Sequence, residues 1–457
     1  GYGCRVFYGI KAVRFIMSDY SQLKYGARLI NSFLGANATI SCCEVLNSLI
    51  YPAHEQHHNN SFLCAALVMG QSNIAAGATL GSNHNSRGAD GEVIMGRGFW
   101  PGLCVSIKHN SIFPSFTILN KGDYNYELNI PIPFSLISND YVKDELVVMP
   151  GYWFLYNFYA LARNAWKYQN RDNRKNIDQY FEYDYLAPDS VNELLKGRDV
   201  IASAVAKAQL LKEKKSTTIG EDQLVQLGCK LLTTKTKKEI DQLDVFVDGF
   251  ENSKRKTRLI KCHDAFAIFE KMIFMYGMDQ LMLKLTQHGM KNLPTKLKAI
   301  KTNSVAIEWS NIGGQLIPTK SVQTMLQQIK SDKLNSWHDV HQFYQTQTEK
   351  YLDKKNTHAL YCLELIEGVS ISGLSNKKMN DWLDRYQAIK EEVTQKIKSS
   401  REKDYTNPFR KMVYENQAEM DAIVGDLKDN SFIEQQNAEQ MQLNQFIIEF
   451  KHALKAK

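Results

Sequence analysis

The sequence lacks the short motifs that mark several large enzyme classes. It contains no GxxxxGK[ST] phosphate-binding loop and no GxSxG nucleophile motif. It therefore carries neither the signature of P-loop nucleotide hydrolases nor that of α/β-hydrolases. Its acidic residues also form no paired pattern that would single out a glycosidase.

The sequence is equally short of signals for secretion or membrane insertion. Its eight cysteines include no CxxC pair, which is typical of reduced thiols in a cytoplasm. No basic-then-apolar leader is present, and the longest apolar run, 146–162, is interrupted by Pro150, Gly151 and Asn157. We expect a cytoplasmic protein that does not enter a membrane. The opening GYGCRVFYG reads as repeat sequence, so we also expect the N-terminus of a longer protein to be missing.

With 457 residues, 44% of them hydrophobic and 23% charged, the chain can form two or three globular domains. The net charge of +7 is concentrated in the basic runs 212–215, 235–238 and 254–258. No aromatic residues or binding motif accompany these lysines, so the runs predict a solvated helical surface rather than a nucleic-acid site.

A period of six residues organises the first third of the chain. Aliphatic residues recur at this spacing, with small residues between them, in VMGQSNIAAGATLGSNHN (68–85). This period fits neither a helix nor simple alternation, and it is typical of a parallel β-helix, in which the aliphatic residues stack inside the coil. The predicted inward-facing residues are Leu34, Ile40 and Leu46, then Val68, Ile74 and Leu80, then Ile94, Trp100, Ser106, Ile112 and Ile118.

After Pro150 the pattern changes to long helical segments. We predict helices over 151–170, 189–214, 259–289, 336–368, 376–401 and 408–457, and a loop over 304–320. The resulting fold class is β + α, a left-handed parallel β-helix of hexapeptide repeats followed by a large α-helical region. The predicted domains are the β-helix with inserted loops (1–145), a helical domain packed on it (146–330) and a long-helix region (331–457).

Histidines cluster in and beside two segments, 52–67 and 82–93, that interrupt the hexads and that we interpret as loops on a rigid scaffold. His54-Glu55-Gln56-His57-His58 matches HExxH, a zinc-binding pattern when it lies on a helix. No amphipathic helix is predicted there, so a metal site is not favoured. A neutral imidazole can act as a general base near pH 7, and the candidates are His57, His58 and His84. The alternative is that these histidines only fix the loop conformation.

Polar residues of the second segment and its surroundings form a candidate binding set. They have too many hydrogen-bonding groups to belong to a core, and an arginine guanidinium offers two N–H donors to an anion. The alternative is a surface loop whose Asn and Gly residues were chosen for turns. The candidate substrate-binding residues are Asn83, Asn85, Arg87, Asp90, Arg97, Lys108 and His109.

The hexads at 34–45 and 68–85 resemble the hexapeptide-repeat, left-handed β-helix superfamily, which includes acyltransferases and sugar-nucleotide enzymes. The longer stretches CCEVLNSLIYPAHEQHHNN, GRGFWPGL, PGYWFLYNFYALARNAWKYQN and WSNIGGQLIP resemble a bacterial family of unknown function, with a β-helix followed by helices. The superfamily's acyltransferases imply a homotrimer, active sites between neighbouring coils, a histidine base and an acyl-CoA or acyl-carrier donor. The cofactor is unknown, with acyl-CoA or a nucleotide sugar possible. The long helical C-terminus departs from the usual acyltransferase tail.

These observations leave three hypotheses open. The first is a transferase-like enzyme that binds a sugar, a sugar nucleotide or a similar polar metabolite at loops 52–67 and 82–97. The second is a non-catalytic ligand-binding or assembly scaffold that forms a homo-oligomer. The third and weakest is a metal-dependent hydrolase built on the histidines.

Overall fold

The computed structural model describes residues 1–82, 91–175, 177–302 and 306–455. The chain forms two compact units. Unit 1 comprises Gly1–Tyr152, Tyr168–Phe269 and Glu308–Tyr351, and unit 2 comprises Trp153–Lys167, Glu270–Ile307 and Leu352–Lys457. The predicted domain limits near residues 145 and 330 remain predictions.

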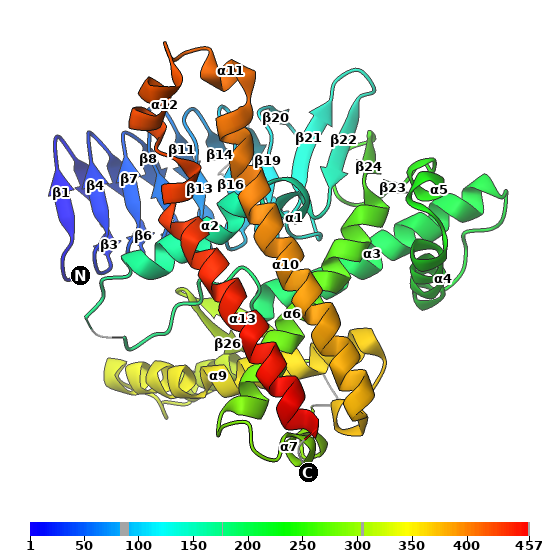
Figure 1. Ribbon diagram of the computed structural model, residues 1–457. Helices are drawn as coiled ribbons and strands as arrows, with labels where there is room; N and C mark the ends of the chain where they lie inside the picture. Colours follow the sequence, from blue (N-terminus) through cyan, green and yellow to red (C-terminus); the bar gives the residue numbers. More distant parts are fainter. Residues whose placement is uncertain (83–90, 176, 303–305, 456–457) are drawn as a thin grey trace. The chain divides into compact units, whose positions relative to one another are not determined.

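Unit 1 begins with a parallel β-solenoid of about seven turns, and a helical region follows it in the chain, which confirms the predicted fold class. Each turn adds one short strand to each of three sheets, whose successive rungs lie side by side (Figure 1). The left-handed sense of the coil remains a prediction. The first sheet holds β1 (Arg5–Phe7), β4 (Gln22–Lys24), β7 (Thr39–Ser41), β10 (Glu55–Gln56) and β13 (Asn73–Ile74).

The other two sheets run along the solenoid in the same way. The second sheet holds β2 (Lys11–Val13), β5 (Arg28–Ile30), β8 (Glu44–Leu46), β11 (Phe62–Cys64), β14 (Thr79–Ser82), β17 (Ser106–Lys108) and β20 (Asp123–Tyr124). The third holds β3 (Ile16–Met17), β6 (Phe33–Leu34), β9 (Leu49–Ile50), β12 (Ala66–Val68), β15 (Val93–Met95) and β18 (Ile112–Phe113).

Columns of stacked side chains fill the solenoid. In the first sheet, Leu23, Ile40, Gln56 and Ile74 occupy equivalent positions and are fully buried. Burial of such aliphatic side chains supplies the main stabilisation, roughly 1.5–3 kcal/mol for each one. Residues with positive φ form the corners between strands, as Asn31 (49°) and Asn47 (48°) do.

The predicted phase of the repeat is right at five of the six positions in the middle coils and wrong by one residue in the last run. Leu34, Ile40, Val68, Ile74 and Leu80 are fully buried, as predicted, whereas Leu46 is half-buried and Val45 faces inward instead. Ile112 is 47% exposed, and its neighbour Phe113 faces inward instead. In this run the inward positions follow the predicted ones by one residue, because side chains of a strand alternate between its two faces.

The first face of the solenoid continues into a mixed sheet beyond residue 140. A hairpin of β21 and β22 extends it, and β24 pairs in parallel with β22. These strands are β16 (Trp100–Pro101), β19 (Ile118–Leu119), β21 (Leu136–Asp140), β22 (Glu145–Met149), β24 (Lys256–Leu259) and β23 (Phe246–Val247), in sheet order.

The helices of unit 1 include α3 (Pro188–Lys212), α4 (Glu221–Thr234), α5 (Lys237–Asp241) and α8 (Thr319–Lys330). Helix α4 packs closely on α3 at Gly228, where an added Cβ would lie 1.8 Å from the carbonyl oxygen of Ala202. The segment predicted as a loop, 304–320, instead contains a β-hairpin of β25 (Trp309–Ile312) and β26 (Gln315–Pro318). Its turn residues Gly313 and Gly314 both have positive φ, which glycine adopts without strain.

Unit 2 is helical. Helices α10 and α13 pack along each other (Figure 1), and Trp382 of α10 lies edge-on to the ring of Phe274. Helices α2, α6 and α9 contribute residues to both units. The remaining bounds are α1 (Tyr152–Tyr156), α2 (Phe158–Arg171), α6 (Cys262–Thr286), α7 (Leu293–Lys298), α9 (Trp337–Glu367), α10 (Asn376–Thr406), α11 (Pro408–Lys411), α12 (Gln417–Val424) and α13 (Ser431–Lys455). None of the helices in the described part of the chain combines the length and apolarity needed to cross a bilayer.

Candidate functional site

The segment 52–67, predicted to be a loop, is a regular coil of the solenoid. It contains β10, β11 and the start of β12, and each of these strands pairs with the coils on both sides. The prediction of a loop is therefore wrong. The buried polar residues His54, Gln56 and Ser61 form a polar patch inside the solenoid rather than part of an insertion.

His54 lies in that internal patch and is fully buried. Its Nδ1 is 2.8 Å from Ser72 Oγ and its Nε2 is 3.2 Å from Gln56 Oε1. Gln56 Nε2 donates in turn to Ser61 Oγ at 3.0 Å. Burial lowers the pKa of His54 to about 4, so the imidazole is neutral at pH 7 and serves as a hydrogen-bonding core group.

His57 and His58 lie at the corner that follows β10, with ring centroids 4.4 Å apart. His58 is exposed and has a φ of 72°. Since the HExxH residues occupy a strand and a corner rather than a helix, His54 points into the solenoid while His58 is solvent-exposed. The zinc-helix interpretation of this motif is therefore wrong.

Five of the predicted site residues lie outside the described part of the chain, namely Asn83, His84, Asn85, Arg87 and Asp90. The register shows that the coil containing them is long. Thr79 pairs with Ser106, 27 residues further on, whereas Ser106 pairs with Asp123 after 17. The sequence interpretation of an insertion after Leu80 therefore agrees with the pairing on either side of it.

Lys108 and His109 lie beside this insertion. Lys108 Nζ is 2.6 Å from Glu127 Oε1, and this contact lowers the pKa of Glu127 to about 2. His109 Nδ1 accepts a hydrogen bond of 2.6 Å from the backbone N–H of Gly91. Both side chains thus have intramolecular partners.

Arg97 is 2% exposed and is held within unit 1. Its Nε and Nη2 bind the two carboxylate oxygens of Asp189 at 3.0 and 2.8 Å. Its Nη1 donates to Gln71 Oε1 at 2.7 Å and to the carbonyl oxygen of Asp184 at 2.6 Å. A ligand could reach this guanidinium only by displacing these partners, so the geometry gives Arg97 a role in joining the solenoid to α3.

The structure does not bring the described candidates together. His57 and His58 lie at the corner between the first and second sheets, His109 at the corner after β17 of the second sheet, and Arg97 at the corner before β16, which continues the first face. Successive corners of a three-sided coil point in different directions. A single site that contains all of these side chains is not formed by the described residues.

A polar groove lies instead on the outer surface of the first sheet. Its floor is a ladder of side chains at equivalent positions of successive coils, where Arg5 pairs with Gln22, Gln22 with Thr39, and Thr39 with Glu55. Neighbouring rungs are separated by roughly 4.8 Å. The groove has a volume of about 540 Å³ and is lined by Gly3, Arg5, Tyr20, Gln22, Asn37, Thr39, Glu55, Tyr168, Arg171, Asn173 and Lys175.

The wall of the groove comes from the end of α2 and the chain after it. Asn37 Nδ2 donates to Asp172 Oδ1 at 3.0 Å, which fixes this segment to the solenoid. Arg174 binds the same carboxylate through Nε and Nη2, at 2.9 and 2.7 Å, and its guanidinium lies 3.4 Å from the ring centroid of Phe181. These contacts hold Arg171 and Lys175 over the ladder.

The charge in the groove is mainly positive. Arg5, Arg171 and Lys175 face one carboxylate, Glu55, which lies 3.8 Å from Arg171 Nη1. Lys175 Nζ donates to the Tyr2 hydroxyl at 2.7 Å. The guanidinium of Arg5 makes no hydrogen bond or ion pair with any residue that the structure describes.

Sequence reasoning missed this groove. The ladder could have been found by aligning the coils at their spacing of 16–18 residues and reading the outward positions. The wall could not, because no sequence pattern relates residues 168–175 to a strand more than 100 residues earlier.

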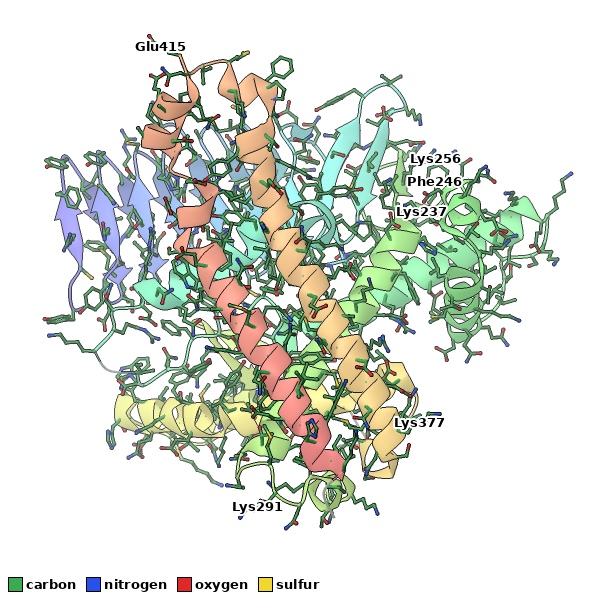
Figure 2. All side chains as sticks on the ribbon, in the orientation of Figure 1. Lys237, Phe246, Lys256, Lys291, Lys377 and Glu415 are labelled. Atoms are coloured by element: carbon green, nitrogen blue, oxygen red, sulfur yellow. The ribbon has the colours of Figure 1, made fainter. Side chains whose placement is uncertain are left out.

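Half of the cations in the basic runs of the middle segment are paired with acids. Arg258 binds Glu145 and Asp244, each at 2.7 Å, and Lys237 binds Asp264. Lys256 lies 4.9 Å from the ring centroid of Phe246, and both side chains appear at the same edge of the sheet in Figure 2. A nucleic-acid partner gains no support from these paired charges.

Comparison with known proteins gives relatives of unknown activity. The profile of a family described as "Domain of unknown function (DUF6819)" matches residues 289–449. An "Uncharacterized protein" of Treponema pallidum (strain Nichols) is 39% identical over 433 residues, which are 95% of this chain and 58% of the relative. The chain thus spans little more than half of that relative's length.

Among solved structures, the polysialic acid O-acetyltransferase OatWY matches 30% of this chain and 82% of its own chain. The sequence identity is 12% and the TM-score is 0.15. A likeness of this size carries no argument about function.

Proposed function

We propose that this protein binds a polyhydroxylated anion, such as a sugar phosphate, a sugar acid or a sugar nucleotide, in the groove on the first face of the solenoid. The observation that carries the proposal is Arg5, a guanidinium without a partner among the described residues, in a groove that also contains Arg171 and Lys175. A free guanidinium offers paired N–H donors that match a phosphate or carboxylate.

The neutral groups of the groove favour a ligand with hydroxyl groups. Gln22, Thr39 and Asn173 provide donors and acceptors at the floor and wall, and Tyr20 and Tyr168 provide ring surfaces. Burial raises the pKa of the Tyr168 phenol well above its usual value, so this group stays protonated. The repeat of polar positions along the solenoid suits an extended ligand that contacts more than one coil.

The test is binding of defined probes to the purified chain. We expect glucose 6-phosphate, glucuronate or UDP-glucose to raise the melting temperature, and neutral glucose to raise it less, because a ligand that binds only the folded state stabilises it. Arg5→Gln should weaken binding by about tenfold or more, since a hydrogen bond to a charged group contributes roughly 1.5–3 kcal/mol.

Arg28→Gln is the matched control. Arg28 is also an exposed arginine of the solenoid, but it belongs to β5 in the second sheet and pairs with Glu44 at 2.9 Å. Its substitution should leave binding unchanged. If Arg5→Gln binds every probe as the parent does, or if glucose binds as well as its phosphate, the proposal fails.

Group transfer is the second part of the proposal and is testable separately. Membership of the hexapeptide-repeat superfamily would supply an acyl-CoA or nucleotide-sugar donor, and His57 or His58 would be the candidate base. These histidines lie at a different corner from the ladder of Arg5, Gln22 and Thr39, so the geometry favours binding over catalysis. Release of CoA or of a nucleoside diphosphate in the presence of a sugar acceptor would support transfer.

The assembly hypothesis is a separate proposal. We propose a homotrimer on the superfamily resemblance alone. Light scattering with size-exclusion chromatography would distinguish a trimer from a monomer.

A further inference from the structure

We propose a second binding site, in unit 2, for an organic anion with an apolar body. The site is a cavity of about 460 Å³ between the end of α6, helix α7 with the residues that follow it, and the middle of α9. All of its lining residues belong to unit 2, so it is independent of the groove on the solenoid. Nothing in the proposed function depends on it.

The charge of the lining residues indicates an anion. Lys284, His288, Lys296 and Lys301 line the cavity, and its lining contains no carboxylate. Within the part of the chain that the structure describes, Lys284, His288 and Lys301 make no hydrogen bond and no ion pair. This arrangement differs from that of Lys237, Arg255 and Arg258 in the basic runs of unit 1, which are paired with acids.

One effect opposes anion binding here, and the structure offsets it. The C-terminal end of a helix carries partial negative charge on its unpaired carbonyl groups. Lys296 Nζ donates to the carbonyl oxygens of Leu285 and Gly289, at 3.3 and 2.6 Å, and so neutralises the end of α6. The remaining lysines are therefore available to a ligand.

Part of the cavity lining is apolar. Leu285 and Leu360 are buried, and Ala299 and Ile300 also line the cavity. Asn356 is also buried, but its Nδ2 donates to the carbonyl oxygen of Gln280 at 2.7 Å, so its amide is held in place. A ligand that fills this volume therefore places carbon on the leucines and negative charge among the lysines.

The chemistry shared by such ligands is a carboxylate or phosphate on an apolar chain. Inorganic phosphate would meet the lysines without burying apolar surface, and an alcohol of equal length would bury apolar surface without meeting the charge. Tight binding needs both the negative charge and the apolar chain, because each buried CH₂ contributes roughly 0.8 kcal/mol in transfer from water. Decanoate and decyl phosphate are suitable probes, with decanol and inorganic phosphate as their matched controls.

Isothermal titration calorimetry of the full chain tests the proposal. We expect decanoate, decyl phosphate or both to bind with a stoichiometry of about one, and the double variant Lys284→Ala/Lys301→Ala to bind at least about tenfold more weakly. The control variant is Lys291→Ala/Lys298→Ala. These two lysines flank the cavity in sequence but do not line it, and Lys291 appears in the loop between α6 and α7 in Figure 2. This control should bind as the parent does.

Ala299→Trp provides a second variant that does not remove charge. Ala299 lines the cavity, follows the last residue of α7 and is not buried, so a larger side chain there should obstruct the cavity without unfolding the chain, which circular dichroism would verify. Binding should then be lost. Equal binding of inorganic phosphate or decanol, no binding of either decyl anion, or full binding by the lysine double variant would overturn the proposal. The groove variant Arg5→Gln should leave this binding unchanged, so the two proposals fail separately.

Discussion

His54 lies inside the solenoid, where its hydrogen bonds and burial favour the neutral form. Its pKa in the folded state is about 4, below the usual 6.5, so the unfolded chain binds a proton more readily than the folded one. The contribution of neutral His54 to the free energy of unfolding is fully present above pH 6.5. It falls by roughly 3 kcal/mol as the pH falls toward 4. Urea unfolding at pH 7.5 and 4.5 would measure this loss.

A pair of variants separates this effect from general acid instability. His54→Gln removes the titrating group and should flatten the pH dependence of the unfolding free energy, although it lowers the stability at neutral pH. His58→Gln changes an exposed corner residue and should keep the parent's pH dependence. An unchanged pH profile in His54→Gln would contradict the assignment.

Arg97 and Asp189 form a buried ion pair, so removing one partner should lower the free energy of unfolding. Arg97→Met leaves Asp189 without its bidentate partner in a site where the arginine is 2% exposed. We expect a destabilisation of about 3–5 kcal/mol, because the remaining charge has no compensating group. Adding Asp189→Leu to this variant should recover part of the loss, which denaturant titration of the four forms would show. Simple additivity of the two changes would argue against direct coupling.

At the scale of the element, the sequence predicts the strands and helices that follow a hydrophobic period and misses the features that do not. The six-residue period predicts the columns that include Ile40, Ile74 and Leu80, and the helical period predicts the long helices. The phase is ambiguous at Ile112-Phe113, because two adjacent apolar residues allow either one to face inward. The coil over 52–67 was missed because His54 and Gln56 take inward positions that the pattern reserves for aliphatic residues. The groove depends on a tertiary contact, Asn37 to Asp172, that no local pattern encodes.

The long coil between Thr79 and Ser106 provides a test at this scale. Its neighbours span 16–18 residues, so deleting 83–90 brings its length from 27 close to theirs and leaves every described strand in place. We expect the variant to fold, with a loss of unfolding free energy of about 1 kcal/mol or less, because closure entropy changes only slightly with the number of residues that connect two paired strands. Circular dichroism and thermal melting would measure the outcome.

The matched control removes eight residues from a regular coil, 37–44. This deletion takes away β7 and shifts every inward position that follows, so we expect it not to fold. If both deletions are equally harmful, the insertion is part of the packed coil rather than an addition to it. If the variant that lacks 83–90 folds but no longer binds sugar phosphates, the predicted site residues of this segment take part in binding. They are Asn83, His84, Asn85, Arg87 and Asp90.

At the scale of the whole molecule, the chain order links the two units. Unit 2 is assembled from three separate stretches, and α6 and α9 each continue from one unit into the other. Within unit 2, the α6 residues Met272, Ile273 and Phe274 are fully buried, and Phe274 packs against Trp382 of α10. Phe274 of α6 therefore packs against a helix that the chain supplies more than 100 residues later.

This arrangement predicts that unit 1 cannot be obtained by truncation alone. A chain that ends at Tyr351 keeps the α6 residues of unit 2 but loses α10 and α13, and so exposes side chains that are now fully buried. Exposing several large apolar side chains at roughly 1.5–3 kcal/mol each exceeds the margin of a typical domain, so the truncated protein should aggregate or bind a hydrophobic dye. Changing Met272, Ile273 and Phe274 to polar residues in the truncated chain should restore solubility and keep the groove's affinity for sugar phosphates. A truncated chain that is soluble and monomeric without these changes would contradict this prediction.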